Sequence, residues 1–296
     1  MREPAVMRVH LVDGTYELFR YHYAPNNRSP ERGATRGVLS SVLDLVADGA
    51  THVGVATDHV IESFRNDLWP GYKDGSGIDE DLFGQFGMLE DVLRAAGFVV
   101  WPMVEVEADD ALAAAAAVAS ADDRVEQAII CTPDKDLAQC VVDDRVVQLD
   151  RRRGELRDAD GVLDKFGVPP ASIPDWLALV GDTADGFPGL AGWGAKSAAT
   201  VLAHYGHLDE IPAASADWEV RPRGAAKLAA TLVEERDHAL LFRRLATLET
   251  DVDVGTVDDW AWTGPTDELD GWCERLNAPR LADRAQQLAA QRTAGG

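Results

Sequence analysis

The sequence is poor in cysteine and has no long apolar run, and each shortage excludes a class of protein. Its three cysteines, Cys131, Cys140 and Cys273, form neither a CxxC pair nor a metal-type spacing. We expect reduced thiols, as in a cytosolic protein, and no disulfide framework. No run of about 18 apolar residues occurs, so no membrane span is expected. The N-terminal residues lead directly into a strand-like run, so we expect no signal peptide and a cytoplasmic protein.

Basic charge is also scarce, with 28 Lys and Arg against 51 Asp and Glu and a formal net charge of -23. This balance argues at first against nucleic acid, because phosphates favour basic surfaces. A site for several divalent cations would, however, absorb many carboxylates, and arginines cluster after residue 150. The composition therefore leaves the partner open. The 296 residues allow one large domain or two small ones.

Short β-rich apolar runs alternate with helical spacing through the first half of the chain. The strand-like runs cover residues 8–12, 52–57, 98–101 and 127–131, and the helical stretches cover 35–47, 82–96 and 111–119. This alternation predicts a parallel α/β sheet with flanking helices. Beyond about residue 160 the pattern is helical, over 175–180, 195–205 and 223–248, and we expect a helical end piece with a loose tail. We expect an α/β core over 1–165, with a polar excursion around 62–82, and a helical region over 166–296.

Acidic side chains recur where these predicted strands end. Asp13, Asp58, Asp134 and Asp136 all follow such runs, and parallel sheets place their sites outside the carboxyl ends of their strands. Three more acids, Glu107, Asp109 and Asp110, open the alanine-rich helix, where an alternative role is to compensate the helix dipole. Asp182 and Asp185 follow a later helix.

These nine carboxylates include no histidine or cysteine partner. Oxygen ligands suit Mg²⁺ or Mn²⁺ rather than zinc. Two such ions about 4 Å apart can bridge a scissile phosphate, which suits phosphodiester hydrolysis. A glycine-rich turn at 189–194 precedes a helix and offers backbone N–H groups to a phosphate, with Lys196 adding charge and Ser197 a hydroxyl. The alternative for this turn is a plain helix-turn-helix corner.

Taken together, the motifs resemble those of the flap endonuclease and 5′-3′ exonuclease family, which includes the 5′-nuclease domain of bacterial DNA polymerase I. The resemblance rests on Leu11-Val12-Asp13-Gly14, Asp58 with Ser63-Phe64-Arg65, Tyr72-Lys73, Glu107-Ala108-Asp109-Asp110, Asp134-Lys135-Asp136, Gly181-Asp182-Thr183-Ala184-Asp185 and Gly192-Trp193-Gly194-Ala195-Lys196. They occur in family order from about residue 8 to 210. The resemblance implies a PIN-like core followed by a helix-three-turn-helix region, and a stand-alone nuclease that hydrolyses DNA near 5′ ends and flap junctions.

The resemblance also implies roles for individual residues. A first metal ion would be surrounded by Asp13, Asp58, Glu107, Asp109, Asp110 and Asp134. A second would lie near Asp134, Asp136, Asp182 and Asp185. Arg20, Lys73 and Arg65 would meet the scissile phosphate or threaded strand, although Arg65 could instead form a structural salt bridge. Duplex DNA would be bound by the helix-three-turn-helix residues Gly192, Gly194, Lys196 and Ser197. K⁺ would be a further ligand of that motif. Expected partners are DNA with 5′ ends, flaps or nicks, and RNA primers, for a nucleoid-associated monomer.

Two departures from the family pattern concern substrate handling. Ser76 stands where the family usually has an arch arginine, and Gly186 stands where it usually has asparagine. All the acids remain, so the chemistry is expected to survive. The alternatives are a catalytically silent protein that binds DNA junctions, and a phosphatase or toxin-type ribonuclease. A dehydrogenase is disfavoured because no GxGxxG follows the first strand.

Overall fold

The computed structural model describes residues 7–295, which form two compact units. Among the described residues, unit 1 comprises 7–61, Gly75–Thr132 and 250–295, and unit 2 comprises Glu62–Asp74 and Pro133–Glu249. Among the described residues, no helix combines the length and apolar character needed to cross a bilayer.

Unit 1 contains the predicted parallel sheet. Its strands are β1 (Met7–Asp13), β2 (His52–Asp58), β3 (Val99–Met103) and β4 (Val125–Cys131), in the order β3-β2-β1-β4. All three pairings are parallel, with Leu11 opposite Gly54 on β2 and Ile130 on β4. The central strands are buried on both faces, which explains why they read as continuous apolar runs. The parallel α/β prediction is confirmed.

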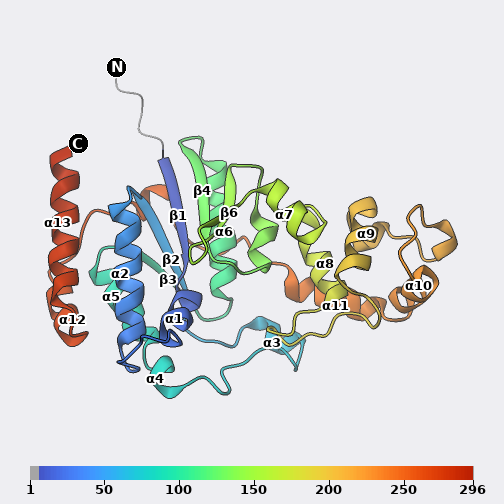
Figure 1. Ribbon diagram of the computed structural model, residues 1–296, viewed down its shortest axis with the longest axis horizontal. Coiled ribbons are helices and arrows are strands. Elements are labelled where there is room, and N and C mark those ends of the chain that lie inside the picture. The colour runs from blue at the N-terminus through green and yellow to red at the C-terminus, as the bar shows by residue number, and fades with distance from the viewer. Residues whose placement is uncertain (1–6, 296) are drawn as a thin grey trace. The chain divides into compact units, whose positions relative to one another are not determined.

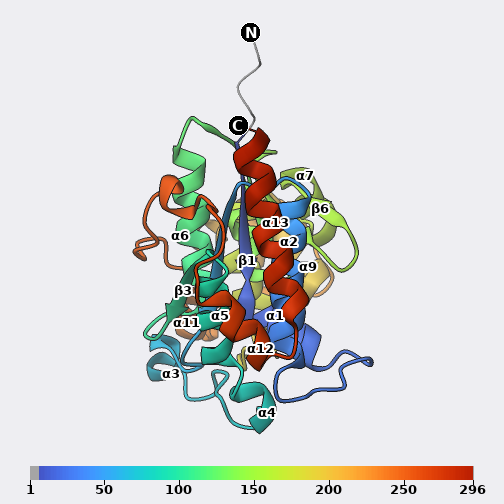
Figure 2. The same cartoon turned by 90° about the vertical axis from the view of Figure 1, so that its left-hand side faces the viewer.

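Helices cover this sheet in the arrangement that right-handed crossovers require. α2 (Gly33–Ala47) and α5 (Phe86–Ala95) lie on one side, whereas α6 (Ala108–Ala121) packs against the strands from the other (Figure 1). The remaining elements are α1 (Gly14–His22), α4 (Glu80–Phe83), the short 3-10 helix η5 (Val257–Trp260), α12 (Leu269–Arg275) and α13 (Pro279–Gly295). Figure 2 shows α13 running along α2. Because α13 continues to Gly295, the expected loose tail is not found in the described chain.

The C-terminal segment from Thr250 belongs to unit 1, whereas the sequence placed it with the helical region. Tryptophan side chains anchor it to the sheet and its helices. The indole of Trp101 donates to the carbonyl oxygen of Val254 (3.1 Å), and that of Trp262 donates to Ala96 (2.8 Å). Since each indole has its hydrogen bond, these large side chains are buried without an unsatisfied donor.

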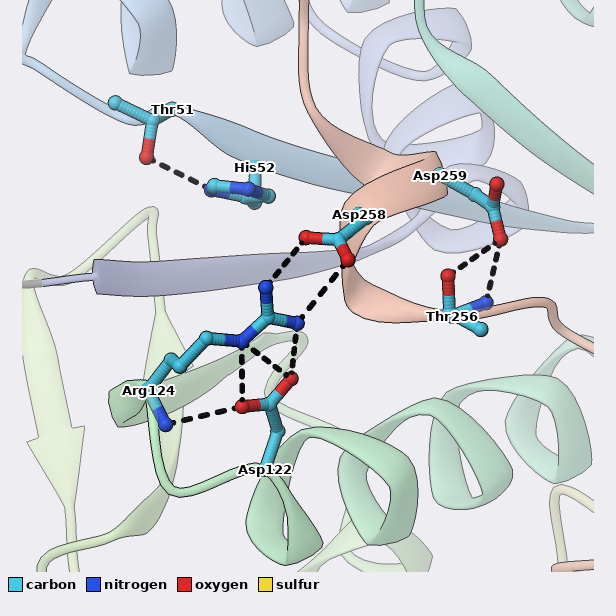
Figure 3. Close-up of polar contacts among 7 residues, drawn as sticks. All are labelled: Thr51, His52, Asp122, Arg124, Thr256, Asp258 and Asp259. Atoms are coloured by element: carbon cyan, nitrogen blue, oxygen red, sulfur yellow. Dashed lines mark hydrogen bonds and ion pairs between the residues drawn. The ribbon is translucent and has the colours of Figure 1, made fainter.

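An arginine links the same segment to the start of β4. The guanidinium of Arg124 lies between the carboxylates of Asp122 (2.6 Å) and Asp258 (2.8 Å), as Figure 3 shows. The hydrogen bonds to both acids raise the pKa of Arg124, so it stays charged. Its side chain is half exposed, and we therefore regard this link as a specific join between segments with little effect on stability.

Unit 2 is mainly helical. Its elements are α3 (Phe64–Leu68), η1 (Asp136–Cys140), β5 (Val146–Asp150), β6 (Glu155–Arg157), α7 (Ala159–Phe166), η2 (Pro170–Ser172), α8 (Ile173–Val180), α9 (Ala195–Tyr205), η3 (Leu208–Glu210), η4 (Ser215–Asp217), α10 (Ala225–Glu234) and α11 (Arg236–Ala246). β5 and β6 form an antiparallel pair. A buried aromatic and aliphatic core includes Trp176, Phe187, Trp218 and Phe242.

The excursion at 62–82 is more ordered than the sequence suggested. It contains α3 and α4, and three of its side chains are buried: Arg65, Tyr72 and Leu82. Tyr72 joins the hydrophobic core of unit 2. The stretch is therefore anchored at intervals, in contrast to the expected unpacked loop.

Candidate metal centre and active site

Unit 2 brings three of the predicted acids together. Asp136, Asp182 and Asp185 each offer a carboxylate oxygen, and these oxygens lie within 4.8 Å of one another. All three residues are buried, with exposed fractions of 5%, 3% and 9%. Buried carboxylates at this spacing repel one another strongly unless a proton or a cation is shared among them.

A tight loop supplies two of these acids. The main chains of Asp182 and Phe187 exchange hydrogen bonds of 2.8 and 3.0 Å, which closes the loop and brings Asp182 and Asp185 to one side. The carboxylate of Asp182 also accepts from the N–H of Ala184 (2.9 Å). The third acid, Asp136, begins η1, where its N–H donates to the carboxylate of Asp134 (3.0 Å). Asp134 is itself exposed, so it lies at the rim of this group.

The pKa of Asp136, a member of this group, is affected by burial and by the neighbouring negative charges. Burial, together with the charges of Asp134, Asp185 and Asp182, raises the pKa of Asp136 well above its usual range. Its Oδ1 atom is buried and has no hydrogen-bond partner among the described residues. A buried carboxylate oxygen without a donor is the feature expected of a metal ligand.

Two lysines flank the acids. The ammonium group of Lys135 pairs with Asp182, and that of Lys73 lies 2.9 Å from Asp185. Although burial opposes the charged form, the pairing with Asp182 raises the pKa of Lys135, so it stays protonated. The sequence interpretation included Lys73 but missed Lys135. Its position between two acids, Asp134 and Asp136, was the available signal.

The main chain at Gly186 lies close to the main chain at Gly71, and this contact holds Lys73 beside Asp185. A Cβ atom added at Gly186 would lie 1.9 Å from the carbonyl oxygen of Gly71, and Gly186 has a φ of +83°. The indole of Trp69 donates to the Gly186 carbonyl (3.0 Å), and the main-chain N–H of Lys73 donates to the main-chain carbonyl oxygen of Asp185 (3.0 Å). The glycine that departs from the family pattern is therefore required here, because asparagine would not fit.

The residues present fit a hard divalent cation. The group supplies oxygen ligands only, it is buried, and one of its oxygens lacks any other partner in the described chain. Mg²⁺ and Mn²⁺ prefer such ligands, and a double positive charge would offset the repulsion that raises the pKa of Asp136.

Two of the five acids of unit 1 accept hydrogen bonds at the ends of its strands. Asp13 and Asp58 are the last residues of β1 and β2, as predicted. Asp13 caps α1 through the N–H of Tyr16 (2.8 Å) and accepts from the hydroxyl of Thr132 (3.0 Å). Asp58 accepts from the N–H of Ala108 at the start of α6 (2.8 Å).

The acidic opening of α6 also serves as a helix cap. Glu107 and Asp110 form a reciprocal capping box, in which the N–H of Glu107 donates to Asp110 (2.8 Å). Asp109 is partly exposed. Within the described part of unit 1, no three acids meet as closely as those of unit 2. Glu107 and Asp110 therefore cap α6, and the metal-binding roles of the acids of unit 1 remain a prediction.

The predicted arginines differ in their surroundings. Arg20 forms an ion pair with Glu17 on α1 and lies 4.3 Å from the ring centroid of Tyr21. Arg65 is only 1% exposed and donates to the carbonyl oxygens of Leu245 (2.8 Å) and Thr247 (3.1 Å). Arg65 is therefore held by main-chain carbonyl groups, and it would have to leave these partners to reach DNA.

The glycine-rich turn lies between α8 and α9, as predicted. Trp193 points into the core and donates to the carbonyl of Leu228 (3.2 Å), whereas Gly192 and Lys196 are exposed. The hydroxyl of Ser197 accepts from the N–H of Gly194 (3.0 Å) and so closes the first turn of α9. The turn presents a helix N-terminus and a lysine to solvent, which is the arrangement that a phosphate group requires.

Comparison with known families identifies the family of this chain. The N-terminal resolvase-like domain model of the 5′-3′ exonucleases matches residues 8–167, and the model of their C-terminal SAM fold matches residues 168–268. The chain belongs to the 5′-3′ exonuclease family. DNA polymerase I of Pseudomonas aeruginosa is 37% identical over 262 residues, which cover 86% of this chain and 28% of that protein. DNA polymerase I of Borreliella burgdorferi is 28% identical over 282 residues, covering 92% and 30%.

Solved structures of other nucleases share the fold of this exonuclease-family chain. The T5 5′-exonuclease with zinc ions bound has a TM-score of 0.66 at 16% identity, covering 96% of this chain and 97% of that one. The catalytic core of Rad2 in complex with DNA substrate has a TM-score of 0.63 at 17% identity, covering 96% and 91%. This chain spans less than a third of the length of the DNA polymerase I relatives, so it corresponds to one part of those proteins.

Proposed function

We propose that this protein is a divalent-metal-dependent 5′-3′ exonuclease and flap endonuclease that hydrolyses phosphodiester bonds near 5′ ends and flap junctions of DNA. The observation that carries the proposal is the buried group of Asp136, Asp182 and Asp185, with one carboxylate oxygen that has no other partner in the described chain. Its members lie within the residues that the two models of this family match.

Mg²⁺ or Mn²⁺ bound in this site would lower the pKa of a water molecule and stabilise the charge that develops on the phosphate. The three buried acids of unit 2 would hold and orient one ion, with Asp134 at the rim. A second ion would be bound by the acids of unit 1, which stand at the carboxyl end of a strand or at the start of α6. They are Asp13, Asp58, Glu107, Asp109 and Asp110.

Lys73 and Lys135 would provide positive charge for the substrate. In the structure each pairs with one of the three acids. A divalent cation in the site would neutralise the same carboxylates, and both ammonium groups would then be available to a DNA phosphate. Arg20 would be a third positively charged group that contacts the DNA phosphate. The turn at Gly192 and Gly194, with Lys196 and Ser197, would bind the duplex backbone, with K⁺ as an additional ligand. We also propose RNA primers as substrates, a monomeric state, and action in the cytoplasm at the nucleoid.

Cleavage of a labelled 5′-flap duplex and a matched blunt duplex tests the proposal. We expect cutting near the junction with Mg²⁺ or Mn²⁺ and none with chelator. Asp182→Asn should lower the rate by about 100-fold or more, because several kcal/mol of transition-state stabilisation depend on the ion. Asp217→Asn is the matched control, since it removes an exposed carboxylate from the same unit. Junction binding without cutting in either metal would instead support the catalytically silent alternative.

A further inference from the structure

A cavity of about 570 Å³ in unit 1 carries a charge opposite to that of the chain as a whole. It is lined by the end of α1, the connection to α2, the first turns of α2 and the start of α13. Figure 2 shows α1, α2 and α13 together on one side of the unit. Three arginines, Arg20, Arg36 and Arg280, are among the lining residues, and none of those residues is Asp or Glu. In a chain with 51 acidic and 28 basic residues, such a lining concentrates positive potential in one concave place.

The charges of two of these arginines are not compensated. Within residues 7–295, the side chains of Arg36 and Arg280 form no ion pair with a carboxylate, and Arg280 is exposed. Arg20 does pair with Glu17, but its Nε atom is buried and has no hydrogen-bond partner among the described residues. The cavity therefore has guanidinium donors that the protein itself leaves unused.

Two helix N-termini add to this potential. α2 begins at Gly33 and α13 at Pro279, and neither has an acidic residue in its first turn. Gly33 and Arg280 both line the cavity, so both helices begin beside it. The partial positive charge of a helix start attracts anions, and here it acts in the same direction as the arginines.

We propose that this cavity binds a phosphate group through Arg36 and Arg280, with Arg20 as a further donor in its lining. Guanidinium groups match phosphate oxygens in geometry as well as charge. The volume lies within the range of small-ligand pockets and accommodates a nucleoside monophosphate. That the phosphate belongs to a nucleotide rests on the proposed nuclease function. It comes either from a free mononucleotide or from the backbone of bound DNA.

Titration calorimetry with chelator present tests this site without a contribution from divalent cations. The probes are inorganic phosphate, deoxyadenosine 5′-monophosphate and a short blunt duplex. The variant Arg36→Gln/Arg280→Gln should bind at least one of these probes at least about tenfold more weakly than the wild type, because two charged donors are lost. Arg28→Gln is the matched control, since it removes an exposed arginine of the connecting segment that does not line the cavity, and we expect it to bind like the wild type.

The probes separate the two sources of the phosphate. Binding of the mononucleotide by the wild type but not by the double variant indicates a free ligand. A difference confined to the duplex, with a shallower dependence of affinity on salt, indicates a backbone phosphate. Equal binding of all three probes by both proteins, or binding of none of them by the wild type, overturns the inference. If the double variant fails to fold, Arg280→Gln alone replaces it, because that residue is exposed.

The inference and the proposed function can fail separately. If the wild type cleaves the flap in Mn²⁺ but Arg36→Gln/Arg280→Gln has no effect on phosphate binding, only the inference about the cavity is contradicted. If the wild type binds phosphate but does not cut DNA, and the double variant loses phosphate binding, the proposed function is contradicted. The protein is then a phosphate-binding protein.

Discussion

Replacing Arg65 with alanine separates a structural role from a role in DNA binding. The guanidinium is buried and donates to the carbonyl oxygens of Leu245 and Thr247 at the end of α11. A hydrogen bond from a charged donor contributes about 1.5–3 kcal/mol, and removing the donor leaves a buried acceptor unsatisfied. The Thr247 bond is only partly buried, so we take the lower value for it. The two bonds together then give a loss of about 3–4.5 kcal/mol in the free energy of unfolding.

A loss of this size lowers the melting temperature by about 10 °C, since about 2–4 °C corresponds to each kcal/mol in a domain of this size class. Calorimetry measures it directly, and fluorescence anisotropy with a flap duplex in chelator measures DNA affinity. Arg244→Ala is the matched control, because Arg244 contacts the same Phe64 ring at the same 4.7 Å but is half exposed. We expect that control to lose less than about 1 kcal/mol. A variant Arg65→Ala that melts like the wild type but loses DNA affinity would refute the structural role.

Three further predictions concern the acidic site and one strand. Asp136→Asn should raise the melting temperature in chelator, because it removes a buried like charge, and should abolish stabilisation by Mn²⁺. Gly186→Ala should lower the free energy of unfolding by about 2–4 kcal/mol, because it combines a positive φ with a clash against the Gly71 carbonyl; denaturant unfolding measures this loss. Burial lowers the pKa of His52 below its ordinary 6.5, so the stability that depends on its neutral form should be complete above pH 6.5, should decrease as the pH falls from 6.5 to the lowered pKa, and should be lost below it. NMR titration that gave His52 a pKa above 6.5 would contradict this.

The central sheet was predictable because its signals are local. The apolar runs that became β1 and β2 are buried on both faces, and a parallel sheet requires Asp13 and Asp58 to meet at one edge. Helix α1 was missed because its periodicity is interrupted by a charge in the interior. Glu17 is fully buried there and paired with Arg20, which hides the apolar stripe that normally reveals a helix.

The features that depend on distant residues could not be read from the sequence. The return of the C-terminal segment to unit 1 depends on Trp101 and Trp262 finding carbonyl partners far away in the chain. The burial of Arg65 depends on two carbonyl groups at the end of α11. The requirement for glycine at Gly186 depends on Gly71, more than a hundred residues earlier, and only the three-dimensional packing shows it.

The measurement that tests the account most directly is the single-turnover rate of 5′-flap cleavage as a function of Mn²⁺ concentration, for the wild type, Asp136→Asn and Asp217→Asn. We predict no cutting by the wild type in chelator and a saturable rise with Mn²⁺, which the Asp217 control should reproduce. Asp136→Asn should need at least about tenfold more Mn²⁺ or remain inactive, because it loses the carboxylate whose Oδ1 atom has no other partner in the described chain. Cleavage in chelator, or the same Mn²⁺ dependence in Asp136→Asn as in the wild type, would contradict the assignment of this acidic group as the metal centre.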